Sequence, residues 1–386
     1  MHLIGGNMSE VINLCQELVR FQSVEENVEE AMSFLQKYLQ NIGFSTRLMF
    51  FDTNNKKRIP GLCATYGKGS PHLLFSGHID VVTPGNVSAW KYPPFEAHIE
   101  DEILYGRGIA DMKGGIACFI KACKDFIATN NFSGKITLII SGDEENPIIE
   151  GSQRILETLN DEGEKFDFAL VGEPSNPKTM SDEIKIGRRG DIVLNITSYG
   201  QLGHTAYADK SSNPIYNLTN LLYTLQNDKL DNGNAYFAPS MLHITTIDVN
   251  NCASNVVPNL AHARVDIRFN SEHTYNDIEN WVNEHIKKIT GSFKIEYEYI
   301  GESFLSPINE HTEKLKQIIV KHTGFSPKYS TSGGTSDARY IKDYCPVIEY
   351  GLTNSTIHKV NECENISNIE LLYKIYRDFL TDFFNS

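Results

Sequence analysis

The chain has 386 residues, of which 40% are hydrophobic and 22% are charged, and its formal net charge is -14. This length exceeds what one ordinary hydrophobic core supports, so we expect two domains, and the composition is that of a globular rather than a disordered protein. The negative charge excludes nucleic acid and anionic membranes as natural partners, because both are themselves polyanionic.

The first part of the chain alternates predicted helices and strands. Its N-terminal residues predict two helices, one with Ser9 as its N-cap and one that follows Asn27 and stops at Gly43. Further along come a strand that ends at Ser76, a helix after Asp111, a strand over 135–141, a helix after Gly151 and a strand over 168–171. This alternation indicates an α/β layer structure.

The pattern changes near Gly187, where apolar and polar residues begin to alternate as in a half-buried strand. The predicted elements are a strand at 192–196, a helix opened by Asn213-Pro214, strands at 242–249 and 263–269, a helix over 275–289 and a strand at 295–299. This β-α-β-β-α-β order is that of a ferredoxin-like module. A helix near 313–322 and a strand near 347–350 then return to α/β character. We therefore predict an α/β domain made of residues 1–186 and 301–386, with residues 187–300 inserted as a second domain.

The cysteines and the apolar stretches restrict the setting and the available metal ligands. Seven cysteines are scattered without a Cys-x-x-Cys pair, which argues against a disulfide framework and a thiolate zinc site. Apolar stretches such as 136–140 are too short to span a bilayer, and the first residues lack the pattern of a signal peptide. We expect a cytoplasmic protein in which any metal is held by His and carboxylate side chains.

The segment 76–80 places His78 at the end of an apolar strand, where open α/β sheets position their sites. His78 and Asp80 point to the same side of an extended strand, so Asp80 can accept from one ring nitrogen and fix the tautomer. Taken alone, the segment is better interpreted as a surface His near a turn.

Two further segments gather carboxylates. The glycine-rich segment 105–115 contains Asp111 at a predicted helix start, where an Asp commonly serves only as an N-cap, and its spacing fits no phosphate-binding loop. Asp143, Glu144 and Glu145 directly follow an apolar strand. Adjacent acids repel one another, so a nearby cation is one reason to gather them, and a solvated acidic turn is the alternative.

Glu173 ends another strand, and His358 lies in the segment 356–359. Each of these positions is more readily structural than functional when it is considered singly. Together they place two His and several carboxylates at strand ends and loops of one α/β domain. That ligand set suits a divalent ion such as zinc, so the combination predicts a metal site that no single member predicts.

These segments resemble the co-catalytic zinc amidase and carboxypeptidase family, and the resemblance extends from the first helix to His358 and beyond. The parts that are similar to the desuccinylases of that family are WKYPPF at 90–95, LYGRGIADMKG at 104–114, IGRRG at 186–190, STSGGTSDAR at 330–339 and TIHKVNE at 356–362. The resemblance implies a zinc-peptidase-like α/β catalytic domain with an inserted ferredoxin-like dimerisation domain. It also implies a homodimer with two Zn2+ ions per subunit, and Co2+ as an alternative.

The resemblance implies a role for each ligand. Asp111 would bridge the two ions. The pair His78 and Glu173 would complete one position, and the pair Glu145 and His358 would complete the other. Glu144 would act as the general base and Asp80 would orient His78. The Asp111–Met112 peptide is expected to be cis.

The inserted domain is implied to supply residues to the partner's site. His204 would stabilise the oxyanion there and Asn255 would also cross over, although an ordinary loop His is the alternative for His204. The substrate carboxylates would be bound by Arg188, Arg268, Thr335 and Asn354. Arg268 could equally lie on a solvated strand face, and the segment 208–212 departs from the pattern of the desuccinylases.

The implied reaction is hydrolysis of the amide bond of N-succinyl-LL-2,6-diaminoheptanedioate, a step of lysine and diaminopimelate biosynthesis. An acetylornithine deacetylase, or a related N-acyl-amino-acid amidohydrolase, is the enzymatic alternative. The Arg188-Arg189 pair favours the succinyl substrate, which presents several carboxylates. A catalytically dead metal-binding scaffold is the non-enzymatic alternative, and it would be expected to lack a ligand or the base.

Overall fold

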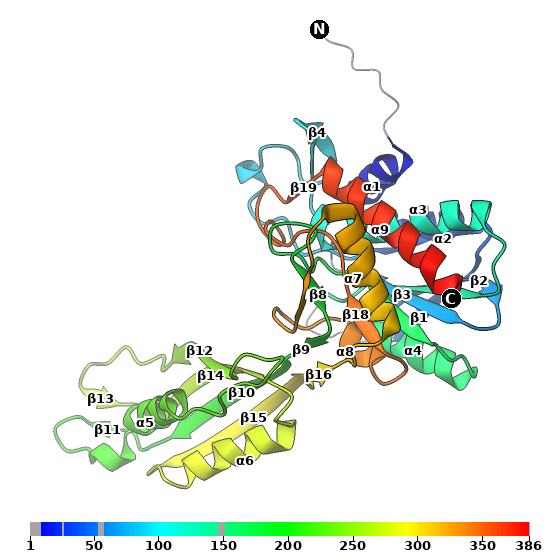
Figure 1. Cartoon of the computed structure of the whole chain (residues 1–386). Helices are drawn as coiled ribbons and strands as arrows, with labels where there is room; N and C mark the ends of the chain where they lie inside the picture. The colour runs from blue at the N-terminus through cyan, green and yellow to red at the C-terminus, as the bar shows by residue number, and fades with distance from the viewer. Residues whose placement is uncertain (1–8, 25–26, 53–57, 146–150, 386) are drawn as a thin grey trace. The chain divides into compact units, whose positions relative to one another are not determined.

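The computed structural model describes residues 9–24, 27–52, 58–145 and 151–385. The chain divides into two compact units (Figure 1): Met1–Ile186, Ser306–Ser330 and Ser336–Ser386 form the first, and Gly187–Leu305 with Thr331–Thr335 form the second. The second unit extends past the predicted boundary at 300, because β16 (Phe304–Leu305) pairs with β9 (Gly187–Arg188). The segment Thr331–Thr335 belongs to it as well, which no pattern in the sequence indicates.

The first unit is built on a mixed sheet with the strand order β1-β2-β6-β3-β7-β18-β8-β17. Its strands are β1 (Ser45–Asp52), β2 (Arg58–Lys68), β3 (His72–His78), β6 (Gly134–Ser141), β7 (Phe168–Val171), β8 (Glu183–Lys185), β17 (Lys328–Ser330) and β18 (Val347–Glu349). The four neighbours β6, β3, β7 and β18 run parallel. Their carboxyl ends therefore meet at one edge of the sheet, where α/β folds place their sites.

Helices cover both faces of this sheet. The main core lies between one face and the helices α1 (Glu10–Arg20), α2 (Glu29–Asn41), α3 (Gly114–Thr129), α7 (Glu310–Thr323) and α9 (Ile366–Phe384). On the opposite face, α4 (Gly151–Asp161) packs on β2 and β6 and contacts α8 (Ala338–Ile341). None of the helices formed by the described residues combines the length and the apolar character needed to cross a membrane.

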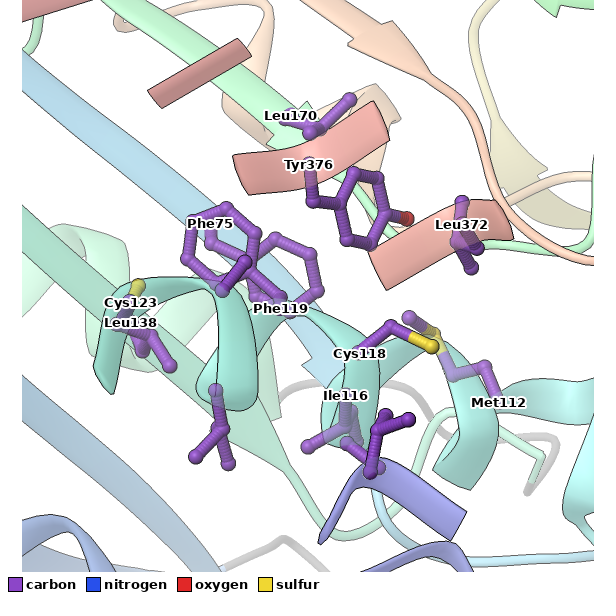
Figure 2. Close-up of a cluster of buried hydrophobic side chains, with 14 of the residues drawn as sticks. Phe75, Met112, Ile116, Cys118, Phe119, Cys123, Leu138, Leu170, Leu372 and Tyr376 are labelled. Carbon is purple, nitrogen blue, oxygen red and sulfur yellow. The ribbon is translucent and has the colours of Figure 1, made fainter. Parts of the chain in front are cut away.

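Aromatic rings join the central strand to two helices in this core (Figure 2). The rings of Phe75 on β3 and Phe119 on α3 are stacked at a centroid distance of 3.9 Å, and Tyr376 on α9 meets both rings edge-on. The Tyr376 hydroxyl donates a hydrogen bond of 2.5 Å to the backbone O of Tyr350. Such packing fixes β3, the strand that ends in His78.

The start of α1 agrees with the sequence interpretation, and the starts of α2 and α3 differ from it. Ser9 occupies the N-cap position of α1 but its side chain makes no capping hydrogen bond. The N-cap of α2 is Val28 rather than Asn27. Asp111 is not an N-cap, because α3 begins at Gly114 and the backbone at Asp111 is non-helical. The pattern therefore located all three helices but gave the correct N-cap only for α1.

The second unit has an antiparallel sheet in the order β12-β14-β10-β15. Its main elements, in chain order, are β10 (Gly190–Tyr199), α5 (Pro214–Asn227), β12 (Met241–Asp248), β14 (Leu260–Phe269), α6 (Tyr275–Ile286) and β15 (Ser292–Gly301). Buried apolar residues of both helices pack on one face of the sheet. The predicted ferredoxin-like order of elements is confirmed.

Candidate metal centre

The predicted ligands of the first unit gather at the carboxyl edge of its sheet. His78 is the last residue of β3, and Glu144 and Glu145 follow the end of β6. Glu173 lies two residues beyond β7. The other two ligands come from irregular segments, Asp111 from the turn before α3 and His358 from the loop before β19 (Cys363–Asn365).

Asp111 lies between the two His rings. Its Oδ1 is 3.2 Å from His78 Nε2, and its Oδ2 is 3.3 Å from His358 Nε2. His78 Nε2 also lies 3.6 Å from Glu173 Oε1, and His358 Nε2 lies 2.9 Å from Glu145 Oε1. Two donors that each lie about 2.0 Å from a tetrahedral ion are about 3.3 Å apart, so these spacings suit two ions that share Asp111.

Two groups of three residues could each hold a metal ion, because the three ligand atoms within each group lie within 4.8 Å of one another. One group is His78, Glu144 and Glu173, and the other is His78, Asp111 and Glu145. His78 is buried, whereas the His358 side chain is 49% exposed. His358 also has φ of 59°, a left-handed conformation that is uncommon for any residue except glycine. Nitrogen and carboxylate donors in this number fit divalent ions of the zinc type.

The electrostatics of the cluster favour a bound cation. Burial raises the pKa of Glu144 and Glu173 well above the usual range, and neighbouring carboxylates add to the effect. Burial opposes the charge on His78 too, but hydrogen bonds to Asp111 and Asp80 outweigh it and raise the His78 pKa. Because carboxylates packed this closely repel one another, divalent cations would relieve a repulsion that the His side chains only partly offset.

Asp80 holds the segment that carries Glu144 and Glu145. Its Oδ1 accepts the backbone N–H of Glu144 at 3.2 Å, and its Oδ2 accepts that of Glu145 at 2.9 Å. The His78 Nδ1 lies 3.0 Å from the backbone O of Asp80 and 3.5 Å from its carboxylate. The Asp80 backbone is therefore the nearer partner of the ring, while its carboxylate positions two neighbouring acids.

Glycine at two positions lets the Asp111 segment approach the strand ends. A Cβ at Gly77 would lie 2.8 Å from Met112 Cε, and one at Gly172 would lie 2.9 Å from the same atom. These glycines directly precede His78 and Glu173, so a Cβ at either position would require the end of the Met112 side chain to shift within the core shown in Figure 2. The Asp111–Met112 peptide is cis, as the resemblance implies.

His204 and Asn255 lie side by side in the second unit. β11 (Gly203–His204) pairs with β13 (Val256–Val257), and the Thr205 N–H donates to the backbone O of Asn255 at 3.0 Å. Both residues are exposed, and the neighbouring Tyr207 is 90% exposed. The two residues expected to act on a partner thus lie together on an open surface of their unit.

The predicted substrate contacts have different surroundings. Buried Arg188 donates from Nη1 to the backbone O of Ser332 at 3.2 Å, beside the segment that contains Thr335. Arg268 is held by Asp266 at 2.8 Å and by Asp191 at 2.9 Å, so two carboxylates already pair with its guanidinium. The remaining one, Asn354, lies in the first unit and donates from Nδ2 to the backbone O of Pro174 at 3.3 Å, next to Glu173.

Sequence reasoning did not single out a buried ion pair behind the centre. Glu362 pairs with Arg107 and accepts backbone N–H groups of the Asp111 segment. Both residues lie inside segments quoted for the resemblance, at 104–114 and 356–362. The opposite charges of Arg107 and Glu362, each in the same segment as a predicted metal ligand, were the available signal.

A family model described as Peptidase family M20/M25/M40 matches residues 74–382, which include every ligand of the centre. The chain belongs to this family. Two relatives named "Succinyl-diaminopimelate desuccinylase" are those of Pelagibacter ubique and Ehrlichia canis, which are 42% and 43% identical over 97% of this chain and 98% of their own lengths.

Solved structures of the M20 family share the fold. An M20 family metallo-carboxypeptidase from Sulfolobus solfataricus superposes with a TM-score of 0.81 at 19% identity, covering 98% of this chain and 100% of the other. A Bacillus subtilis protein described as a dinuclear metal binding peptidase of the M20 family gives a TM-score of 0.69 at 13% identity, covering 97% of this chain and 98% of the other. At these identities the likeness establishes the architecture alone.

Proposed function

We propose that this chain is a metal-dependent succinyl-diaminopimelate desuccinylase, which hydrolyses N-succinyl-LL-2,6-diaminoheptanedioate to succinate and LL-2,6-diaminoheptanedioate. The observation that carries the chemistry is the Asp111 carboxylate, whose two oxygens lie 3.2 and 3.3 Å from the rings of His78 and His358. The substrate is proposed from relatives of that name that are 42% and 43% identical over nearly their full lengths.

Two zinc ions are the proposed cofactors, with cobalt as an alternative. His78, Asp111 and Glu173 would hold one ion, and Asp111, Glu145 and His358 the other. A pair of such ions supplies Lewis acidity for the amide carbonyl and makes water acidic enough to deprotonate near neutral pH. The centre gathers more carboxylates than its His side chains can neutralise, which supports this assignment.

Glu144 is the proposed general base. Its carboxylate lies 4.0 Å from His78 Nε2, at the ligand cluster, and its side chain is 12% exposed. The backbone N–H groups of Glu144 and Glu145 both donate to the Asp80 carboxylate. These hydrogen bonds fix the backbone from which the proposed base and the neighbouring ligand extend. Glu144 would accept a proton from the attacking water and return it to the leaving amine.

The second unit is proposed to be a dimerisation domain that carries His204 and Asn255 to the partner's site. Both residues are exposed, His204 on β11 and Asn255 directly before β13, outside the buried core of the unit, which supports this role. His204 would then donate to the developing oxyanion. The proposed contacts of the substrate carboxylates are Arg188, Thr335 and Asn354, whereas the guanidinium of Arg268 is already paired twice.

The test is a comparison of two substrates on one zinc-loaded preparation. Release of succinate from N-succinyl-LL-2,6-diaminoheptanedioate should exceed release of acetate from N-acetylornithine by at least about 100-fold in kcat/KM. The acetyl group has no carboxylate, so a residue that binds the succinyl carboxylate would be left without a partner. Preferential cleavage of acetylornithine would identify a deacetylase. Absence of any zinc-dependent amidase activity, on these and other N-acyl amino acids, would favour a metal-binding scaffold.

A further inference from the structure

A buried ion pair lies beside the segment that carries Asp111. Arg107 Nη1 is 2.7 Å from Glu362 Oε2, and the two side chains are 2% and 1% exposed. Arg107 Nη2 also donates to the backbone O of Thr83 at 3.3 Å, and its guanidinium lies 5.2 Å from the Trp90 ring. Charges removed from water need several such partners to offset the cost of desolvation. These contacts together stabilise the buried pair.

Glu362 holds the Asp111 segment through three backbone N–H groups. Its Oε1 accepts from Ala110 at 3.0 Å and from Asp111 at 3.3 Å, and its backbone O accepts from Gly106 at 2.9 Å. The dihedral angles of Asp111 and Met112 are non-helical. Regular secondary structure therefore does not fix the position of the Asp111 carboxylate, and the hydrogen bonds to Glu362 do so in its place.

Glu362 also belongs to the loop that carries His358. Thr356 Oγ1 donates to the backbone O of Cys363 at 2.8 Å and accepts from its N–H at 3.2 Å, which closes the loop at its base. Glu362 lies within this closed loop, four residues after His358. One carboxylate therefore ties the loop that carries His358 to the segment that carries Asp111.

His78 and Glu173 depend much less on Glu362. His78 ends β3, which is hydrogen-bonded to β6 and β7 on its two sides. Glu173 follows β7, which is paired with β3 and β18. The sheet therefore fixes one pair of ligands, while His358 lies in an irregular loop that Glu362 hydrogen-bonds to the Asp111 segment.

We infer that Glu362, with Arg107 as its counter-ion, is a positioning residue for the metal position that Asp111 shares with His358. It holds the Asp111 carboxylate and the His358 ring at their spacing of 3.3 Å, and so sets the affinity of that position without touching the ion. The inference rests on the proposed function, because it requires the two-ion centre described there.

The test is the Glu362→Gln variant, in which the amide keeps the size of the carboxylate but loses its charge. Metal-free protein is titrated with Zn2+ by calorimetry, and thermal unfolding is measured on the same preparation. We expect one of the two metal positions to weaken by about 10- to 100-fold, which is the usual effect of removing a partner behind a metal ligand, while the other stays within about 3-fold.

The matched control is Glu364→Gln, two residues further along the chain. Glu364 is 2% exposed and accepts from Thr353 N at 2.9 Å and Thr353 Oγ1 at 2.7 Å, and its other carboxylate oxygen accepts from Asn365 and Asn368. The Glu364→Gln variant should lower the midpoint of thermal unfolding by about as much as Glu362→Gln does. It should leave the zinc affinity of both metal positions unchanged. If Glu362→Gln does not fold, Glu362→Asp, which withdraws the carboxylate by one methylene, should show the same selective loss.

Wild-type zinc affinity at both positions in either Glu362 variant would overturn the inference, as would equal weakening of both positions. The proposed function fails in a different way: wild-type protein that binds two zinc ions but releases no succinate would overturn the activity, and the selective effect at Glu362 would still stand. Wild-type protein that binds fewer than two ions would overturn both.

Discussion

The Nε2 atom of His358 lies 2.9 Å from Oε1 of Glu145, although 213 residues separate the two along the chain. This contact joins the loop before the last helix to the end of a central strand. The protonated ring and the carboxylate would form an ion pair in the metal-free protein, since Asp111 and Glu145 raise the pKa of His358 to about 10. A divalent ion bound here would replace that proton, so metal binding should release protons near neutral pH.

Glu144 and Glu145 should separate into two functions when each is changed to Gln. The Glu144→Gln variant should keep both metals and lose about 100- to 10,000-fold in kcat, because only proton transfer is removed. The Glu145→Gln variant should lose zinc as well as rate. Bound zinc measured by elemental analysis, together with steady-state kinetics, checks this. A near-normal kcat in Glu144→Gln would exclude it as the base.

Asp80 should matter through the two backbone N–H groups that its carboxylate accepts. The Asp80→Asn variant turns an amide N–H2 group towards one of them, so we expect zinc affinity to fall by about 10- to 100-fold. Asp182→Asn is the control, because Asp182 Oδ2 likewise accepts from Lys178 N and Thr179 N, at 2.6 and 2.8 Å, within an exposed turn. Equal zinc affinity in the two variants would show that Asp80 has no special role.

His204 should act in the partner's site. His204→Ala and Glu144→Ala should each be inactive as pure dimers, with zinc content and dimer mass unchanged for His204→Ala. Co-expression of the two should restore about a quarter of wild-type activity, because half of randomly assembled dimers are hybrids and each hybrid has one complete site. Activity that stays at the level of the pure variants would rule out a shared site.

His72 should make stability fall on acidification. Burial lowers its pKa, while its Nδ1–H donates to the backbone O of Lys165 at 2.7 Å. The unfolded side chain titrates near about 6.5, so below that pH the unfolded state binds a proton more readily than the folded state and is favoured. Between pH 7.5 and 5.5, His72→Gln should therefore lose less of its free energy of unfolding than the wild type. Equal pH slopes in denaturant titrations would contradict this.

The sequence predicted the parts of the site that regular strands position. His78 and Glu173 come at strand ends, and their placement follows from apolar runs followed by glycine and an acid or His. Asp111 was ambiguous because its backbone is non-helical just before a helix, a conformation that periodicity does not encode. The resemblance to the family predicted that Asp111 bridges the two ions, and the structure shows that its carboxylate lies between the two His rings.

Contacts between segments that lie far apart along the chain could not be predicted from the sequence. Glu362 accepts from Ala110 across 252 residues, and no local pattern assigns it that partner. Arg268 was left between two interpretations because its pairing with Asp191 depends on the register between β10 and β14. The boundary near 305 likewise depends on a short strand pair that joins residues over 100 positions apart.

The most direct test of the two-metal centre is a zinc titration of metal-free protein with continuous measurement of succinate release. The account predicts two bound zinc ions per chain, with no turnover in the metal-free protein and turnover that rises as the ions bind. Succinate release at full rate from metal-free protein, or saturation of the centre without any release, would contradict it.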